Sequence, residues 1–210
     1  MLKSTMFDLV PLIQVGGYIG LFLIIFAESG LFFGFFLPGD SLLFTAGFLS
    51  SQGYFSIMPL TLLLFIAAVS GDAVGYLFGK KVGPKIFSRP KSFFFRPSHM
   101  EKTARFFDRY GAKTILIARF VPVVRTFAPI MAGVGGMKYR TFAKYNVVGG
   151  LLWAIGLTVL GYVFGQRVPN ADQYVMPIVI VIIIVSFLPP IWEYFKERGR
   201  KGQDINVPTP

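Results

Sequence analysis

The sequence predicts an all-α polytopic membrane protein, and two observations carry this prediction. Hydrophobic residues make up 54% of the 210 residues and charged residues only 15%, against about 25% in ordinary soluble domains. Four stretches are apolar over the roughly 20 residues that a helix needs to cross a bilayer. They lie near Leu9–Ala27, Pro59–Gly79, Thr141–Gly165 and Tyr174–Phe195. Residues 1–210 are expected to form a single membrane domain.

Composition also limits the classes of function. The 21 Lys and Arg exceed the 10 Asp and Glu, giving a net charge of +11. In a membrane protein such an excess commonly lies in cytoplasmic loops that face anionic lipid. The chain has no Cys and one His, so a disulfide framework, a thiolate metal site and a His-based triad are not expected. We therefore expect the membrane as a partner, and no nucleic acid, metal or cofactor.

Two further apolar segments, residues 30–50 and 114–137, are interrupted near their middles. Pro38-Gly39-Asp40 divides the first segment, and Pro122, Pro129 and two arginines divide the second. Each unbroken arm has about 8–10 residues, or about 12–15 Å of helix, which is half a hydrocarbon core. Because proline removes a helical donor and turns the chain, both segments are predicted to be re-entrant helical hairpins.

The positions of the basic residues favour the same topology. Residues 80–113 hold ten Lys and Arg, residues 138–144 hold three, and the tail, residues 196–210, holds four. If residues 114–137 dip into the membrane and return, the first two clusters share the cytoplasmic side, as the positive-inside rule requires. Both termini are then cytoplasmic, and the first hairpin enters from outside. Six full spans satisfy the charges less well, so about four spans and two opposed hairpins are predicted.

The two predicted hairpins resemble each other in sequence. Phe36-Leu37-Pro38 precedes Ala46-Gly47, and Phe120-Val121-Pro122 precedes Ala132-Gly133 after two extra residues. Combined with entry from opposite sides, this similarity favours an inverted repeat, the architecture of many secondary transporters. A chance match is the alternative, because these residue types are common in the chain.

A short amphipathic helix is expected inside the basic loop. Ser98 and Glu101 form a capping box after Pro97, and Gly111 is expected to end the helix that they begin. Its apolar stripe fits a helix lying on the inner membrane surface. Packing against the cytoplasmic face of the protein itself is the alternative.

Charges lie inside or at the edge of the apolar segments, where they are costly. They are Glu28, Asp40, Asp72, Arg119 and Arg125. On insertion scales a charge at the centre of a spanning helix costs about 2.5–3.5 kcal/mol. Five unpaired charges would cost about 12–18 kcal/mol, comparable to the stability of a domain. We expect them to pair where the two hairpins turn, to face water or to change protonation state.

The two arginines are the expected site for an anionic headgroup. Arg119 and Arg125 flank Pro122 at the predicted turn of the second hairpin. Arginine stays protonated and binds phosphate oxygens as a fork, and a broken helix exposes further donors. The alternative is that both arginines only neutralise Glu28 and Asp40.

The acidic residues are interpreted separately. A carboxyl group balanced between burial and a neighbouring arginine can exchange protons, so Glu28 and Asp40 are candidates for proton coupling. A fixed ion pair is the alternative, and Asp40 can also be explained as the cap of the arm that begins at Ser41. For Asp72, helix packing is as good an explanation as a role in transport. Trp153 is interpreted as a packing or interface residue.

Several of these residues lie in motifs that resemble the DedA family of bacterial inner-membrane proteins, which carry a VTT (SNARE-associated-type) domain. The motifs are Glu28-Ser29-Gly30, Phe36-Leu37-Pro38-Gly39-Asp40-Ser41, Gly71-Asp72-x-x-x-Tyr76 and residues 118–129, followed by Lys144-Tyr145-Asn146 and Trp153. The resemblance covers nearly the whole chain, from about Tyr18 to Trp192.

The resemblance implies the fold of VTT-domain lipid scramblases, with two opposed re-entrant hairpins, and a role in lipid translocation. It implies that Glu28 and Asp40 correspond to essential acidic residues of the family, and Arg119 and Arg125 to essential basic ones. Some members return undecaprenyl phosphate from the outer to the inner leaflet, and others are associated with phospholipids such as phosphatidylethanolamine. Proton-motive-force dependence and envelope integrity are also connected with the family.

The leading expectation is a transporter of the bacterial inner (plasma) membrane, not an enzyme. It would flip undecaprenyl (polyprenyl) phosphate from the outer to the inner leaflet, driven by the proton motive force, and so recycle the lipid carrier of the cell envelope. Arg119 and Arg125 would bind the phosphate, while Glu28 and Asp40 would carry protons. The supporting residues would be Asp72, Pro38, Gly39, Pro122 and Pro129.

Three alternatives stay open. They are a phospholipid scramblase or flippase, a membrane phosphatase acting on polyprenyl pyrophosphate, and a non-transporting envelope assembly factor. The lipid and protons are the expected partners, and the sequence leaves a homo-oligomer open.

Overall fold

The structure is a computed structural model that describes residues 9–31, 39–87, 109–167 and 177. These residues form helices and connecting turns, and no strand occurs among them. The elements are α1 (Leu9–Gly30), α2 (Gly39–Ser51), α3 (Ile57–Phe87), α5 (Lys113–Ala118), α6 (Pro122–Val134), α7 (Tyr139–Gly150), the π-helical turn η2 (Leu151–Ile155) and α8 (Gly156–Arg167). The predicted all-helical fold is confirmed.

Two helices of the described part of the chain are long and apolar enough to cross a membrane. They are Ile57–Gly83, within α3, and Tyr139–Arg167, which runs from α7 through η2 into α8. Both coincide with the two central predicted spans. Helix α1 contains the residues of the first predicted span, but it ends in the middle of the molecule, where Gly30 lies against Gly71 of α3, so a full crossing by this segment stays a prediction. The fourth predicted span, Tyr174–Phe195, lies almost entirely outside the described residues.

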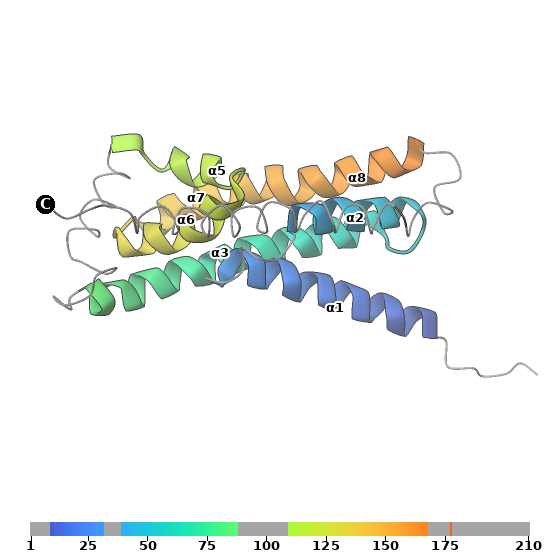
Figure 1. The fold of residues 1–210 in the computed structure, drawn as a ribbon, viewed down its shortest axis with the longest axis horizontal. Helices are drawn as coiled ribbons and strands as arrows, with labels where there is room; N and C mark the ends of the chain where they lie inside the picture. The colour runs from blue at the N-terminus through green and yellow to red at the C-terminus, as the bar shows by residue number, and fades with distance from the viewer. Residues whose placement is uncertain (1–8, 32–38, 88–108, 168–176, 178–210) are drawn as a thin grey trace, which may run out of the picture.

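The two long helices, α3 and α7–α8, run along most of the molecule in opposite directions, and the shorter helices α2 and α6 lie beside them (Figure 1). Helix α2 packs against α8 in one half, and α6 packs against α3 in the other half. Helix α1 packs against α3. The first turns of α2 and α6 meet in the middle, where Asp40 contacts Arg125.

Close backbone approach between α2 and α8 depends on two glycines. A Cβ atom added to Gly47 would lie 1.9 Å from the carbonyl oxygen of Thr158, and one added to Gly161 would lie 2.0 Å from the carbonyl oxygen of Phe44. Both distances are shorter than van der Waals contact, so only glycine fits at either position. The backbones thus pack directly, as small residues allow in membrane helices.

The same contact recurs between α3 and α6. A Cβ atom added to Gly133 would lie 2.1 Å from the carbonyl oxygen of Tyr76, and one added to Gly79 would lie 2.0 Å from that of Ile130. In both interfaces, the glycine and the contacted carbonyl of one helix are three positions apart. One packing geometry is therefore used twice, at opposite ends of the molecule.

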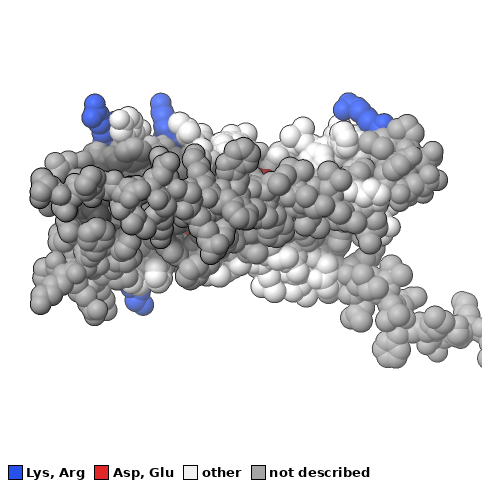
Figure 2. Space-filling view, in the orientation of Figure 1, with Lys and Arg blue, Asp and Glu red and all other residues white. Residues whose placement is uncertain are grey.

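Apart from Arg119 and Arg125, the described basic residues lie towards the ends of the long axis. The C-terminal end of α3, which contains Lys80 and Lys81, lies at the same end of the molecule as the start of α7 (Figure 1), where the Tyr76 hydroxyl donates to the carbonyl of Met137. At the other end, the Gln52 amide donates to the carbonyl of Gly165 at 3.2 Å. On the face drawn in Figure 2, blue side chains appear near the two ends, and the described surface between them is uncharged apart from a trace of red.

The second interrupted segment breaks where the sequence predicts, between α5 and α6 at residues 119–121. Pro122 opens α6, a position that costs no backbone hydrogen bond. The prediction that Pro129 also interrupts the segment is wrong, because Pro129 lies inside α6. Whether this segment and residues 30–50 enter a membrane and return stays a prediction.

Two other local predictions have mixed outcomes. Helix α2 begins at Gly39 and has Asp40 in its first turn, so the alternative in which Asp40 caps an arm starting at Ser41 is wrong. The amphipathic helix of the basic loop lies mostly outside the described residues. Its predicted end fits, because Gly111 has a φ of 71°, a conformation that glycine adopts without strain and that commonly ends helices.

Candidate functional site

All five charges expected to be costly in a membrane lie together in the middle of the molecule. Glu28 is at the end of α1, Asp40 in the first turn of α2, Asp72 in the middle of α3, Arg119 directly after α5 and Arg125 in the first turn of α6. Both arginines are ion-paired with these carboxylates. The prediction that the charges pair is confirmed.

Arg125 is held by two carboxylates at once. Its Nη1 donates to Oδ1 of Asp40 at 2.5 Å, and its Nη2 donates to Oε1 of Glu28. Glu28 is completely buried, whereas the side chain of Asp40 is 48% exposed. The two acids therefore hold the same guanidinium from environments that differ in access to solvent.

A glycine makes room for the buried acid. A Cβ atom added to Gly39 would lie 1.5 Å from Oε2 of Glu28 and 2.2 Å from its carboxyl carbon. The side chain of Glu28 thus lies directly against the backbone at the start of α2, and Oε2 has no hydrogen-bond partner among the described residues. An unpaired carboxylate oxygen in a buried place is a costly arrangement.

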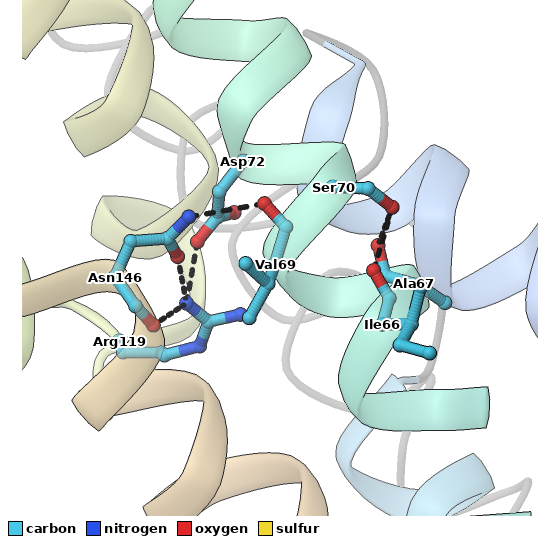
Figure 3. Close-up of polar contacts among 7 residues, drawn as sticks. All are labelled: Ile66, Ala67, Val69, Ser70, Asp72, Arg119 and Asn146. Carbon is cyan, nitrogen blue, oxygen red and sulfur yellow. Dashed lines mark hydrogen bonds and ion pairs between the residues drawn. The ribbon is translucent and has the colours of Figure 1, made fainter. Parts of the chain in front are cut away.

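Arg119 has a different set of partners (Figure 3). Its Nη1 donates to Oδ2 of Asp72 at 2.5 Å and to Oδ1 of Asn146 at 2.7 Å, with the backbone oxygen of Asn146 at 3.4 Å. The Asn146 amide in turn donates to the carbonyl of Val69 at 3.0 Å. Asn146 is therefore held in the orientation in which its oxygen faces the arginine.

One edge of the Arg119 guanidinium carries no hydrogen bond. Its hydrogen bonds to Asp72 and Asn146 all come from Nη1 (Figure 3), while Nε and Nη2 are buried without a partner among the described residues. These two nitrogens form the side-on fork with which arginine binds two oxygens of a carboxylate or phosphate. An arginine buried in this way presents two ready donors to an oxyanion.

Trp153 joins the two arginine clusters. It lies in the π-helical turn η2, and its indole nitrogen donates to Oδ1 of Asp40 at 2.6 Å. The guanidinium carbon of Arg125 lies 4.6 Å from a ring centroid of Trp153, and that of Arg119 lies 5.4 Å away. Both distances are in the range of cation–π attraction.

The sequence prediction missed three features of this site. Asp72, treated only as a supporting or packing residue, is the ion-pair partner of Arg119. Asn146 and Trp153 received no role in the site, although each contacts a charged member of it. The sequence did contain a signal for these two residues, because an amide and an indole stand inside an otherwise apolar predicted span.

The remaining supporting residues have simpler places. Pro122 begins α6, and Pro129 is buried within it, close to Gly75 of α3. Gly39 lies against Glu28, as described above, and Pro38 lies outside the described residues. In the described part of the chain, no cluster of three or more His, Cys, Asp or Glu is placed to hold a metal ion.

Comparisons with known proteins place the chain in a family. The model of the VTT domain matches residues 37–163. Protein DedA of Escherichia coli strain K12 is 47% identical over 193 residues, which cover 91% of this chain and 88% of that protein. The inner membrane protein YqjA of the same strain is 34% identical over 195 residues, which cover 88% of this chain and 87% of that protein.

A mycobacterial relative extends the same result. The uncharacterized membrane protein ML0287 of Mycobacterium leprae is 40% identical over 183 residues, covering 86% of this chain and 82% of that protein. No solved structure matches the chain.

The family match spans most of the chain and includes all the residues of the central site except Glu28. The alignments with the relatives run over nearly the full length of both partners. The chain therefore belongs to the DedA family of VTT-domain membrane proteins.

Proposed function

We propose that this protein is a lipid transporter of the bacterial inner membrane that flips a polyprenyl phosphate, undecaprenyl phosphate in the cell, from the outer to the inner leaflet. The proposal rests on one observation above all. Two arginines are buried where two half-length helices meet, and one of them presents an unpaired pair of donors. Translocation needs no covalent step, and no catalytic residue is assigned.

The chemistry of the arginines favours a phosphate headgroup. The Nε–Nη2 edge of Arg119 has the spacing of two phosphate oxygens, and the positive N-terminal ends of α2 and α6 point into the same region. Large apolar side chains are exposed on the outside of the helices, among them Leu62, Ile66, Ile117, Leu152 and Leu160. A prenyl tail can remain in lipid along such a surface while its headgroup enters the site.

The carboxylates supply a reason for proton coupling. Three acids and two arginines give the central site a formal charge of −1. An incoming phosphate adds negative charge and competes with Glu28 and Asp40 for Arg125. Uptake of a proton by one of these acids removes that conflict, so phosphate and proton would enter together. A membrane potential supplies about 2.3 kcal/mol per charge per 100 mV, which is sufficient to drive an uphill step.

The repeated packing geometry supports an inverted repeat with two opposed re-entrant hairpins. Gly47 and Gly133, each preceded by an alanine in the matched sequences, make equivalent contacts with α8 and α3 respectively. The basic residues at the end of α3 and at the start of α7 share one end of the molecule, as a returning second hairpin requires. We assign this end to the cytoplasm on the positive-inside rule. Helix α1 begins at the opposite end of the molecule (Figure 1), where the backbone N–H of Ser56 donates to the hydroxyl of Tyr18 at 2.9 Å. The start of α1 therefore lies on the outer side, contrary to the predicted cytoplasmic N-terminus, and the cytoplasmic C-terminus stays a prediction.

Reconstituted protein tests the proposal. Liposomes would contain the full chain and fluorescent undecaprenyl phosphate, and leaflet exchange would be followed with and without an imposed pH gradient. We expect gradient-driven movement for wild type and for Arg140→Lys, because Arg140 is an exposed basic residue of α7. Arg119→Lys and Arg125→Lys should each reduce the rate about 10-fold or more, because lysine has no planar fork.

The other outcomes separate the alternatives. Leaflet exchange at the same rate with and without the gradient would contradict coupling and indicate a scramblase. Movement of phosphatidylethanolamine at the same rate as undecaprenyl phosphate would indicate the same. Absence of movement for either lipid would overturn transport and favour an assembly factor, and release of phosphate from a polyprenyl pyrophosphate would indicate an enzyme.

A further inference from the structure

We propose that the indole N–H of Trp153 and Nη1 of Arg125 together form a binding position for one headgroup oxygen, which the carboxylate of Asp40 occupies in the resting protein. The inference rests on the proposed function and assigns a substrate contact to Trp153. Both donors end on the same atom, Oδ1 of Asp40, at 2.6 and 2.5 Å. Two short donors that converge on one oxygen are the arrangement by which proteins bind an oxyanion.

The indole donor of Trp153 is fixed in position, whereas the acceptor, Asp40, can be replaced. Trp153 is buried and belongs to the same apolar cluster as Ile25, Leu64 and Ala68. Its place in a π-helical turn fits the frequent occurrence of such turns at functional sites. Because the ring packs against residues of two other helices, the N–H keeps its direction when its acceptor changes.

Asp40 is the carboxylate that can leave. Its side chain is about half exposed, so solvent can take over its hydrogen bonds. Glu28 is completely buried against the backbone of Gly39 and has no comparable exit. Exposed ion pairs are cheap to open, whereas breaking a buried pair is expensive. A phosphate oxygen would therefore replace Oδ1 of Asp40 while Glu28 continues to hold the other side of Arg125.

Three features of the site then match one class of ligand. The position at the indole N–H of Trp153 would take a single oxygen, and the free Nε–Nη2 edge of Arg119 would take two. A phosphate monoester has three terminal oxygens, whereas a phosphodiester has two. The guanidinium groups of both arginines lie within 5.4 Å of the Trp153 ring, so one headgroup region serves both.

Binding measurements on the purified full chain in a maltoside detergent test this inference. Farnesyl phosphate serves as a short polyprenyl phosphate, farnesol as its uncharged control, and calorimetry gives the Kd. Trp153→Phe keeps a ring over the arginines but removes the donor, and we expect its Kd to rise about 10-fold. Asp40→Asn removes the competing charge, and its Kd should fall about 5-fold.

Fluorescence gives a second readout that needs no change at the site. The chain has two tryptophans, so in Trp192→Phe, with excitation at a wavelength that tyrosine does not absorb, all emission comes from Trp153. We expect farnesyl phosphate to change this emission and farnesol to leave it unchanged. Binding that is unchanged in Trp153→Phe, or emission that ignores bound farnesyl phosphate, would overturn the Trp153 position but leave transport standing. Failure of every variant, wild type included, to bind farnesyl phosphate would overturn the proposed function as well.

Discussion

The two arginines of the central site lie close together but are neutralised differently. Arg119 has one carboxylate and one amide, both buried, and these balance its charge. Arg125 has two carboxylates, of which one is buried and the other is half exposed. The first arrangement is electrically balanced but leaves the Nε–Nη2 edge of Arg119 without a partner among the described residues. The second carries an extra negative charge on a half-exposed side chain.

This difference indicates separate roles for Asp72 and Asp40, the acids that pair with the two arginines. A balanced buried ion pair with fixed geometry holds helices in register, as the Arg119–Asp72 pair does between α3 and the break after α5. A site with one surplus, accessible carboxylate can exchange that carboxylate for another anion. We therefore expect changes at Asp72 to act mainly on stability and changes at Asp40 to act mainly on binding.

The largest effect on stability is expected from Asp72→Val. This change leaves Arg119 buried without a counter-charge, which costs about 3–5 kcal/mol for a buried pair. The double variant Asp72→Val with Arg119→Met removes both charges and should recover most of this loss, because replacing a whole buried pair by apolar residues is often neutral. Urea denaturation of the detergent-solubilised protein measures the free energy of unfolding of both variants.

The assignment of Arg119 and Asp72 as the structural pair would fail if the double variant were as unstable as Asp72→Val. In that case the loss would come from packing around α3 and not from an unpaired guanidinium. A small effect of Asp72→Val alone would also contradict the assignment of this pair as the structural one.

A smaller effect is expected from Gly39→Ala, which acts on the Arg125 side. The added methyl group would meet the carboxylate of Glu28 at 1.5 Å, so the acid must move away from Arg125. We expect a destabilisation of about 1–3 kcal/mol, typical of overpacking. Thermal unfolding of the detergent-solubilised protein measures it.

Gly156→Ala is the matched control for this substitution. Gly156 is also helical, and a Cβ atom there would have no neighbour within 4 Å. Because alanine favours helix over glycine, this variant should be slightly more stable, by about 0.5–1 kcal/mol. Equal losses in both variants would show that the Glu28 contact is not what makes Gly39 necessary.

Much of the fold could be predicted because the features that define a membrane helix lie within one short segment of sequence. A run of about 20 apolar residues is sufficient to indicate a membrane helix, and α3 and α7–α8 follow it. The meeting of the charges followed from their cost in lipid. Pro129 was misjudged because proline inside a helix is tolerated where neighbouring helices pack against it, and Pro129 is buried beside α3.

The choice of partners could not be predicted in the same way. Which carboxylate reaches which arginine depends on the rotation of each helix about its axis, and Asp72 and Arg119 are 47 positions apart. The π-helical turn around Trp153 also shifts the direction of later side chains relative to a regular helix. Hydrophobic periodicity contains no signal for such a turn, so the contact between Trp153 and Asp40 appears only in three dimensions.

The smallest effect on stability is expected from Asp40→Asn. The side chain of Asp40 is half exposed, although that of Arg125 is only 10% exposed, and solvent-exposed ion pairs contribute about 0–1 kcal/mol. The amide oxygen of asparagine can still accept the hydrogen bond from Trp153, and Glu28 still neutralises Arg125. Urea denaturation should therefore place Asp40→Asn within about 1 kcal/mol of wild type, far from Asp72→Val.

This last variant separates the two arginines most sharply, because it combines a small stability change with a large functional one. Gradient-driven movement of undecaprenyl phosphate should fall in Asp40→Asn, since the variant has lost the anion that must return to release the headgroup. A stability loss as large as that of Asp72→Val would show that Asp40 is a structural partner like Asp72. The site would then hold two fixed ion pairs, and exchange at Arg125 would have to begin with Glu28, which no solvent reaches.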